Sequence, residues 1–135
     1  MTDPTFSDDA GLQGDAGPLV VSGDGLAVPV PSGLAVTFLD VVLNAPGPEG
    51  LAARFRFVAP QIKGGAVEFE VASADMAHLC QNFALQRVAK FGPVPSQIII
   101  SLSDSAVPFG EAAPDVTQFF EAYRIEDERC IWEAF

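Results

Sequence analysis

The sequence predicts a single small α+β domain in which an antiparallel or mixed sheet carries one main helix on a face. The 135 residues fit one hydrophobic core. Apolar residue types make up 49% of the chain and charged types 19%, a balance that supports folding. The hydrophobic pattern changes from a strand period to a helix period and back, which predicts the order β-β-β-α-β-β-β.

The beginning of the chain is predicted to be a disordered acidic tail over residues 1–27, followed by one domain at 28–135. Residues 1–31 contain five Asp and no Lys or Arg, and they are rich in Gly and Pro. The run VPVP at 28–31 should be extended, because a residue that precedes proline avoids the helical region.

Three strands are predicted before the helix. Leu34–Leu43 is rich in β-branched and aromatic residues, and Leu51–Ala59 alternates apolar residues with arginines. Asn44–Gly50 contains two Pro and two Gly, which favours a turn between them and an antiparallel hairpin. Val67–Val71 alternates apolar residues with Glu and is expected to be a short edge strand.

One main helix is predicted at Ala74–Phe91, where apolar residues recur at spacings of three and four. Ser73 occupies the expected N-cap position. Gly92 and Pro93 follow as a stop signal.

Three further strands are predicted after the helix. Gln97–Leu102 contains three consecutive Ile, typical of a central strand that is covered on both faces. The loop Ser103–Asp115 leads to a strand pair that spans Phe119 to Phe135. Its turn, Glu126–Arg129, lacks Gly and Asn, so a longer or bulged loop is expected.

Two packing predictions concern the ends of the domain. Trp132 should be buried, because it shares a strand face with Cys130. The segment around Val28, or a partner, should cover the second face of the central strands, which allows a homodimer.

Charge and hydropathy restrict the classes of partner. Seven basic and eighteen acidic residues give a net charge of −11, which disfavours nucleic acid and anionic lipid surfaces. No apolar run reaches the ~20 residues of a membrane-spanning helix. Met1–Asp9 has no Lys, no Arg and no apolar core, so it is not a secretory signal as given. The protein is therefore expected to be cytoplasmic, unless an export leader is missing from this version of the sequence.

No catalytic, cofactor-binding or metal-binding residues are predicted. His78 is the only histidine, and it does not share a helix face with Cys80. Asp75 and His78 are spaced to share a metal, but no third ligand is visible nearby. The glycine-rich stretches lack the spacing of a phosphate-binding or dinucleotide-binding loop. No cofactor is expected.

A polar set forms the weaker candidate site. Its members could line one sheet face as a ligand site or form cross-strand ion pairs, and we favour ion pairs. They are Arg54, Arg56, Glu121, Tyr123 and Arg124. The carboxylates Glu121, Glu126 and Glu133 of the final hairpin are the candidates for acid–base chemistry, although solvated strand faces also explain them.

Cys80 lies on the apolar stripe of the helix, and Cys130 begins the final strand. The two residues approach each other if the helix packs across the sheet. Two buried thiols are the alternative, which a reducing compartment would favour.

The chain resembles a bacterial family of small proteins of unknown function. The resemblance covers about residues 28–135 and rests on VPSG (30–33), ARFRFVAP (53–60), the helix around Cys80, FFEAYRI (119–125) and CIWEAF (130–135). Export signals in that family imply a periplasmic disulfide between Cys80 and Cys130. An acetolactate synthase label on relatives is not supported by this sequence, because a thiamine enzyme needs a far larger chain and a cofactor motif.

Two classes of function follow. The first is a non-enzymatic envelope or binding module with an unknown protein or small-molecule partner. The second is a small enzyme, or an enzyme-associated subunit, that acts through the carboxylates of the C-terminal hairpin.

Overall fold

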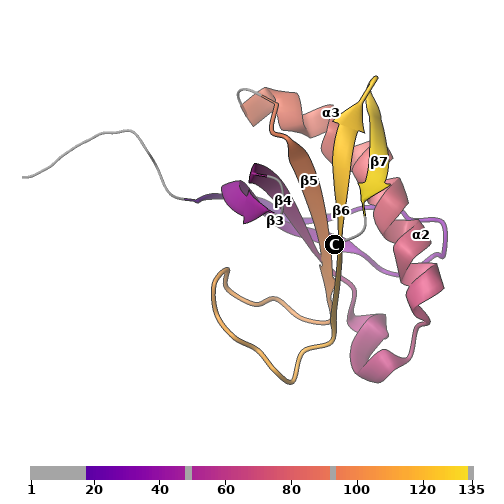
Figure 1. Cartoon of the computed structure of the whole chain (residues 1–135). Helices are drawn as coiled ribbons and strands as arrows, with labels where there is room; N and C mark the ends of the chain where they lie inside the picture. Colours follow the sequence, from indigo (N-terminus) through magenta and orange to yellow (C-terminus); the bar gives the residue numbers. More distant parts are fainter. Residues whose placement is uncertain (1–17, 48–49, 92–93, 134–135) are drawn as a thin grey trace, which may run out of the picture.

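The computed structural model describes residues 18–47, 50–91 and 94–133. In this part of the chain one six-stranded sheet has the order β2-β3-β4-β5-β6-β7 (Figure 1). The strands are β2 (Leu19–Ala27), β3 (Thr37–Gly47), β4 (Gly50–Val58), β5 (Gln97–Ser103), β6 (Gln118–Glu126) and β7 (Arg129–Glu133). β4 and β5 are parallel and the other neighbouring pairs are antiparallel, so the sheet is mixed.

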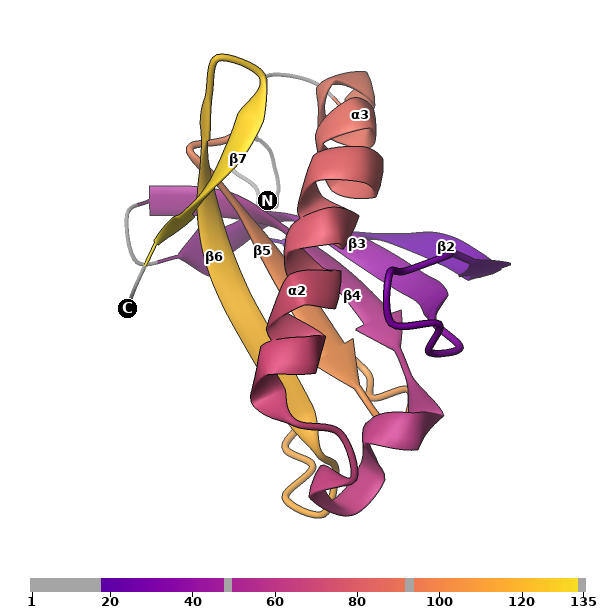
Figure 2. The same ribbon diagram turned by 90° about the vertical axis from the view of Figure 1, so that its right-hand side faces the viewer.

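A single long helical segment connects the two parallel strands. It consists of α2 (Phe69–Leu79), a π-helical turn (Cys80–Ala84), α3 (Leu85–Val88) and a 3-10 turn (Ala89–Phe91), and a separate 3-10 turn (Pro60–Gly65) precedes it. The segment lies across one face of the sheet (Figure 2). Parallel neighbours require such a crossover connection. The predicted fold class, a small α+β domain with one main helix on a mixed sheet, is confirmed.

The main core lies between this helical segment and the sheet. Phe55 and Phe57 from β4 and Ile98 and Ile100 from β5 are fully buried there, as is Met76 from α2. These strand residues alternate along each strand, so they point to the same face. The period-two pattern of β4 therefore correctly predicts its buried face.

The opposite side of the sheet, which we call the open face, has no helix over it. Its own apolar cluster is small and contains Ala52, Ile99 and Ala122. The loop 104–117, drawn in orange, extends from the ends of β5 and β6 on the side away from the helix (Figure 1).

Asp104 and Thr117 close the base of this loop. The backbone N–H of Asp104 donates to the carbonyl of Thr117 (3.0 Å), and the N–H of Thr117 donates to the Asp104 carboxylate (2.9 Å). The bond from Thr117, followed by one from the Ser105 hydroxyl, lowers the pKa of Asp104 below its ordinary value. The loop is therefore fixed at both ends.

The prediction that the segment around Val28 covers the second face of the sheet is wrong. Val28 is buried, but it belongs to the core on the helix side. The reason is that the chain crosses to the helix side after β2, where Val28 donates its N–H to the carbonyl of Val36 (2.9 Å). Coverage by a second copy stays a prediction.

Part of the predicted tail is a strand. Residues 19–27 form β2 and pair antiparallel with β3, whereas residues 1–17 lie outside the described residues. An irregularity between Ser22 and Leu26 interrupts the pairing, and Asp24 and Gly25 there have positive φ. Gly and Asp at this irregularity explain why the composition resembles a tail.

The predicted strand at Val67–Val71 is also wrong, because α2 already begins at Phe69. Phe69 is followed at helical spacing by Ala72 and Met76, which are both fully buried, and this burial outweighs the local alternation. Ser73 is consequently inside the helix and does not cap it. The order β-β-β-α-β-β-β is matched because β2 provides the additional strand before the helix.

The hairpin between β6 and β7 is tighter than predicted. Glu126 pairs directly with Arg129, so the turn has only Asp127 and Glu128, with φ of 52° and 61°. Positive φ at both central residues is typical of a type I′ turn, which matches the twist of the strands. The register of β6 and β7 therefore imposes a tight turn, although Asp127 and Glu128 are not the Asn and Gly that such a turn prefers.

This turn leads to a testable prediction. Replacement of Glu128 by Gly should raise the free energy of unfolding by about 0.5–1 kcal/mol, because Gly adopts positive φ without a steric penalty. Urea denaturation measures the change. Glu126→Gly, at a strand position of ordinary φ, is the control and should destabilise the protein. An unchanged or lower stability for Glu128→Gly would contradict the strain assigned to the turn.

Candidate functional site

The five polar residues predicted as one set lie on two faces of the sheet. Arg54 and Arg56 of β4 and Arg124 of β6 are on the open face. Glu121 and Tyr123 of β6 are on the helix face, where both are buried. Adjacent residues of a strand point in opposite directions, so Tyr123 and Arg124 cannot belong to one site.

Two of the three arginines form ion pairs. Arg56 binds Asp40 of β3 in a bidentate pair, with Nε–Oδ1 at 2.8 Å and Nη2–Oδ2 at 2.9 Å. Both residues of this pair are buried, with 8% and 7% of their surface exposed. Arg124 contacts Glu126 at 2.9 Å and Glu133 at 3.8 Å near the surface. The positive charges of Arg56 and Arg124 are therefore balanced.

Arg54 differs from its neighbours. Among the described residues no carboxylate lies within ion-pair distance of Arg54, and its buried Nε has no hydrogen-bond acceptor. The guanidinium lies over the ring of Phe120, at 5.4 Å from the centroid. Burial, and then the charge of Arg56, lower the pKa of Arg54 from its ordinary value. An arginine nevertheless keeps its charge at neutral pH, so among the described residues this positive charge has no counter-ion.

A groove of about 230 Å³ lies beside these arginines, and we call it the arginine groove. It lies between the open face and the loop 104–117. Its lining residues are Arg54, Arg56, Val107, Pro108, Phe109, Gly110, Glu111, Ala113 and Gln118. The Phe109 ring faces the guanidinium of Arg56, at 5.6 Å from the centroid. The groove thus combines Arg54, which has no ion-pair partner among the described residues, with the carboxylate of Glu111 and with aromatic and aliphatic walls.

Glu121 is the centre of a separate network on the helix face. Its Oε1 accepts hydrogen bonds from Ser73 (2.9 Å) and Tyr123 (3.2 Å), and its Oε2 accepts one from Trp132 Nε1 (3.1 Å). Burial, and then the nearby carboxylate, raise the pKa of the Tyr123 hydroxyl above its ordinary value. Three neutral donors thus fix this carboxylate between α2, β6 and β7.

The prediction that Trp132 is buried is wrong, because 57% of its surface is exposed. β7 is an edge strand of five residues, so neighbours lie on only one side of the indole. The hydrogen bond to Glu121 satisfies the indole N–H while the ring stays at the surface.

The three carboxylates of the final hairpin do not form one group, because two of them pair with Arg124 and the third lies on the other face of the sheet. Glu121 lies on the helix face, while Glu133 accepts a hydrogen bond from Gln97 (2.8 Å) and, like Glu126, contacts Arg124. Paired acid–base chemistry needs two carboxyl groups on either side of one substrate. This arrangement does not provide that geometry.

The two cysteines come together as the sequence and the resemblance suggested. Their sulfur atoms lie at disulfide-bonding distance, and the α-carbons are 6.2 Å apart. Cys80 begins the π-helical turn and is fully buried. Gln81 supports the contact, because its side chain accepts from the N–H of Cys130 (2.9 Å) and donates to the carbonyl of Glu128 (3.2 Å).

Asp75 and His78 have other contacts than a shared metal. The backbone N–H and the hydroxyl of Ser32 both donate to the buried carboxylate of Asp75. His78 Nδ1 lies 3.1 Å from the side-chain nitrogen of Asn82. Within residues 18–47, 50–91 and 94–133 no group of three His, Cys, Asp or Glu side chains is placed to hold a metal ion. The helices of this part of the chain include none long and apolar enough to cross a membrane.

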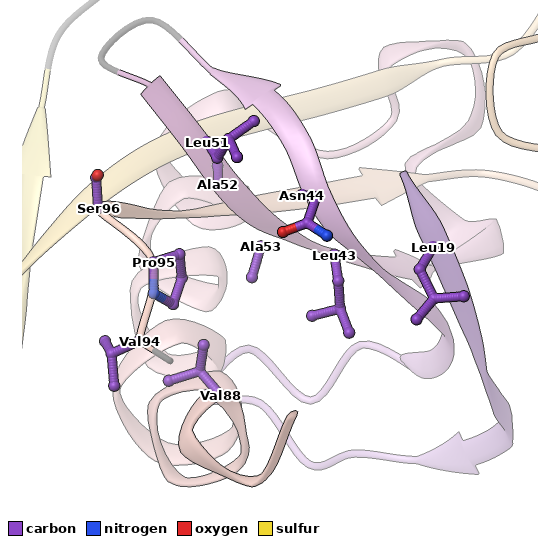
Figure 3. A pocket seen from close by; sticks show the side chains of 10 residues that line it. All are labelled: Leu19, Leu43, Asn44, Leu51, Ala52, Ala53, Val88, Val94, Pro95 and Ser96. Carbon is purple, nitrogen blue, oxygen red and sulfur yellow. The ribbon is translucent and has the colours of Figure 1, made fainter. Parts of the chain in front are cut away.

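A larger groove of about 370 Å³ lies at the other end of the sheet (Figure 3). Leu43 and Ala53 point from β3 and β4 toward Val88 on the helix, with Val94 and Pro95 on one side and Leu19 on the other. Its other lining residues are Asn44, Leu51, Ala52 and Ser96. No charged side chain is among these residues, so nothing here selects a class of ligand.

The fold and its grooves define a small α+β domain in which one helical segment covers one sheet face and an arginine groove lies on the other. The model of a family of unknown function (DUF6497) matches residues 12–135, and the chain belongs to this family. The resemblance to a family of unknown function is therefore confirmed, and the match begins earlier than residue 28. Comparisons with curated proteins and with solved structures find no match.

Proposed function

We propose that the protein is a non-enzymatic binding module that holds its ligand in the arginine groove. The observation that carries this proposal is the state of Arg54, a partly buried cation without an ion-pair partner among the described residues. A buried donor without a partner destabilises a protein by about 1–3 kcal/mol in general, and a bound anion would offset part of this cost by supplying the missing negative charge beside Arg54.

The contrast with Arg56 supports this choice of site. Arg56 lies on the same strand face only two residues away and has a complete bidentate partner in Asp40. The described part of the fold therefore supplies a counter-ion for Arg56 and none for Arg54. Ligand binding would provide the counter-ion for Arg54.

The alternative, a small enzyme that uses the carboxylates of the C-terminal hairpin, has weaker support. Glu121 is held by three donors on the helix face, while Glu126 and Glu133 lie near Arg124. The arginine groove itself contains a single carboxylate, Glu111. Binding therefore fits this geometry better than acid–base catalysis.

The cysteine pair supports a location in an oxidising compartment, such as the periplasm of a bacterium. Disulfides persist in such compartments and are rare in a reducing cytosol. Mass spectrometry of non-reduced digests of the protein from its native cells tests this location. A linked peptide pair containing Cys80 and Cys130 is expected, whereas two free thiols would contradict it.

The binding proposal is tested by NMR with the full chain. A panel of small anions, cations and neutral molecules is titrated into ¹⁵N-labelled protein. The side-chain N–H signals of Arg54 and Gln118 and the backbone signal of Phe109 should shift together with at least one probe. Shifts restricted to the groove around Leu43 and Val88, or no shifts in the arginine groove with any probe, would refute the proposal.

A further inference from the structure

We propose that the arginine groove binds a small monocarboxylate with an apolar body. This inference rests on the proposed function and specifies its ligand class. It follows from three properties of the groove: its charge, the donors of Arg54 and the apolar residues around them.

The charges of the lining favour a monoanion over a dianion. Asp40 neutralises Arg56, so Arg54 is the cation of the lining without an ion-pair partner among the described residues, and Glu111 adds one negative charge. The whole chain carries −11. A phosphate dianion would leave excess negative charge beside Glu111, and its usual sites contain several cations or a helix N-terminus. A single carboxylate pairs with Arg54 and is repelled less by Glu111 than a dianion is.

The donors of Arg54 favour a planar acceptor. A guanidinium presents parallel N–H groups that match the two oxygens of a carboxylate. The Nε–H of Arg54 is buried, so a ligand in the groove would accept from the terminal Nη groups of the same guanidinium. The cation–π contact with the Phe120 ring, 5.4 Å from its centroid, stabilises the position of the Arg54 guanidinium before the ligand arrives.

The remaining surface favours an apolar body. Val107, Pro108 and Phe109 line the groove from the loop, and Phe109 is itself held against Arg56. Burial of apolar ligand surface against such residues favours binding. A volume near 230 Å³ suits a ligand about the size of phenylacetate.

Phenylacetate is therefore the probe, and isothermal titration calorimetry of the full chain is the measurement. Phenylacetamide has the same shape without the charge, and inorganic phosphate has the charge without the apolar body. Phenylacetate should bind saturably and about tenfold or more tighter than either, since one charge-assisted hydrogen bond corresponds to roughly a tenfold to hundredfold difference in affinity.

Variants locate the binding. Arg54→Gln should weaken phenylacetate binding about tenfold to hundredfold. Arg54→Lys keeps the positive charge but lacks the parallel N–H groups of a guanidinium, so it should give an intermediate loss. Arg124→Gln removes an arginine of the same face outside the groove and should change the affinity less than about twofold. Thermal unfolding of each variant shows whether it is folded.

The outcomes separate this inference from the proposed function. If phosphate or phenylacetamide binds as tightly as phenylacetate, with shifts at Arg54, the monocarboxylate inference is refuted while the binding groove stands. If phenylacetate binds to Arg54→Gln and to Arg54→Lys as tightly as to the unchanged protein, the inference is also refuted. If no probe perturbs the groove, both fail.

Discussion

Loss of the contact between Cys80 and Cys130 should lower the free energy of unfolding by about 4 kcal/mol. The two residues are 50 positions apart, so their covalent link closes a long loop and restricts the unfolded chain. The link also connects the edge strand β7 to the helical segment. Within the sheet β7 has one neighbouring strand, β6. Urea denaturation with and without a reducing agent measures the difference.

A cysteine-free protein provides the control for this prediction. The Cys80→Ala, Cys130→Ala double variant should unfold at a lower urea concentration than the oxidised protein and should not respond to the reducing agent. Its thermal midpoint should be lower by about 10–20 °C. Equal stability of the native protein under both redox conditions, with the link verified by mass spectrometry beforehand, would contradict the role assigned to it.

Removal of Asp40 should be about as damaging. Asp40→Ala leaves Arg56 buried without a counter-ion, beside a second cation at Arg54. Breaking a buried pair by removing one partner costs about 3–5 kcal/mol in general. Chemical denaturation of the variant measures this loss.

Two further variants isolate the electrostatic part of this effect. Glu126→Ala removes one partner of the exposed Arg124 pair and should cost at most about 1 kcal/mol. The Asp40→Ala, Arg56→Ala double variant should lose less stability than the sum of its two single variants, because no unpaired charge is left. Strict additivity would show that the two side chains do not depend on each other.

The central part of the fold could be predicted from hydrophobic patterning. β4 has a clear period of two, and the run Ile98–Ile100 correctly indicates a strand covered on both faces. The C-terminal part of the helix was also predictable, because its buried residues recur at helical spacing. In these segments local pattern and tertiary packing agree.

The errors occur where long-range packing decides. The Gly and Asp residues of β2 are typical of a tail, so its composition does not indicate a strand. Gly23 is required there because a Cβ at this position would lie 2.5 Å from the Phe38 ring. The sequence contains no sign of this close approach. The start of α2 similarly depends on burial against the sheet rather than on the Ser73 cap.

The candidate site was only partly accessible from sequence. The arginines of β4 could be selected because they interrupt an apolar strand, and alternation could have separated Tyr123 from Arg124. Asp40 could not be assigned to Arg56, because β3 has an irregularity between Phe38 and Asp40 that changes its register. Phe109 reaches the groove from a loop whose path no periodicity indicates.

A crystal structure of the protein with phenylacetate is the most direct measurement of the central claim, that the arginine groove is a binding site for a carboxylate. The carboxylate oxygens should lie about 2.7–2.9 Å from the guanidinium nitrogens of Arg54. The ring should contact Phe109 and Val107. An Arg54 that stays without a ligand in crystals where phenylacetate occupies another surface would contradict the claim.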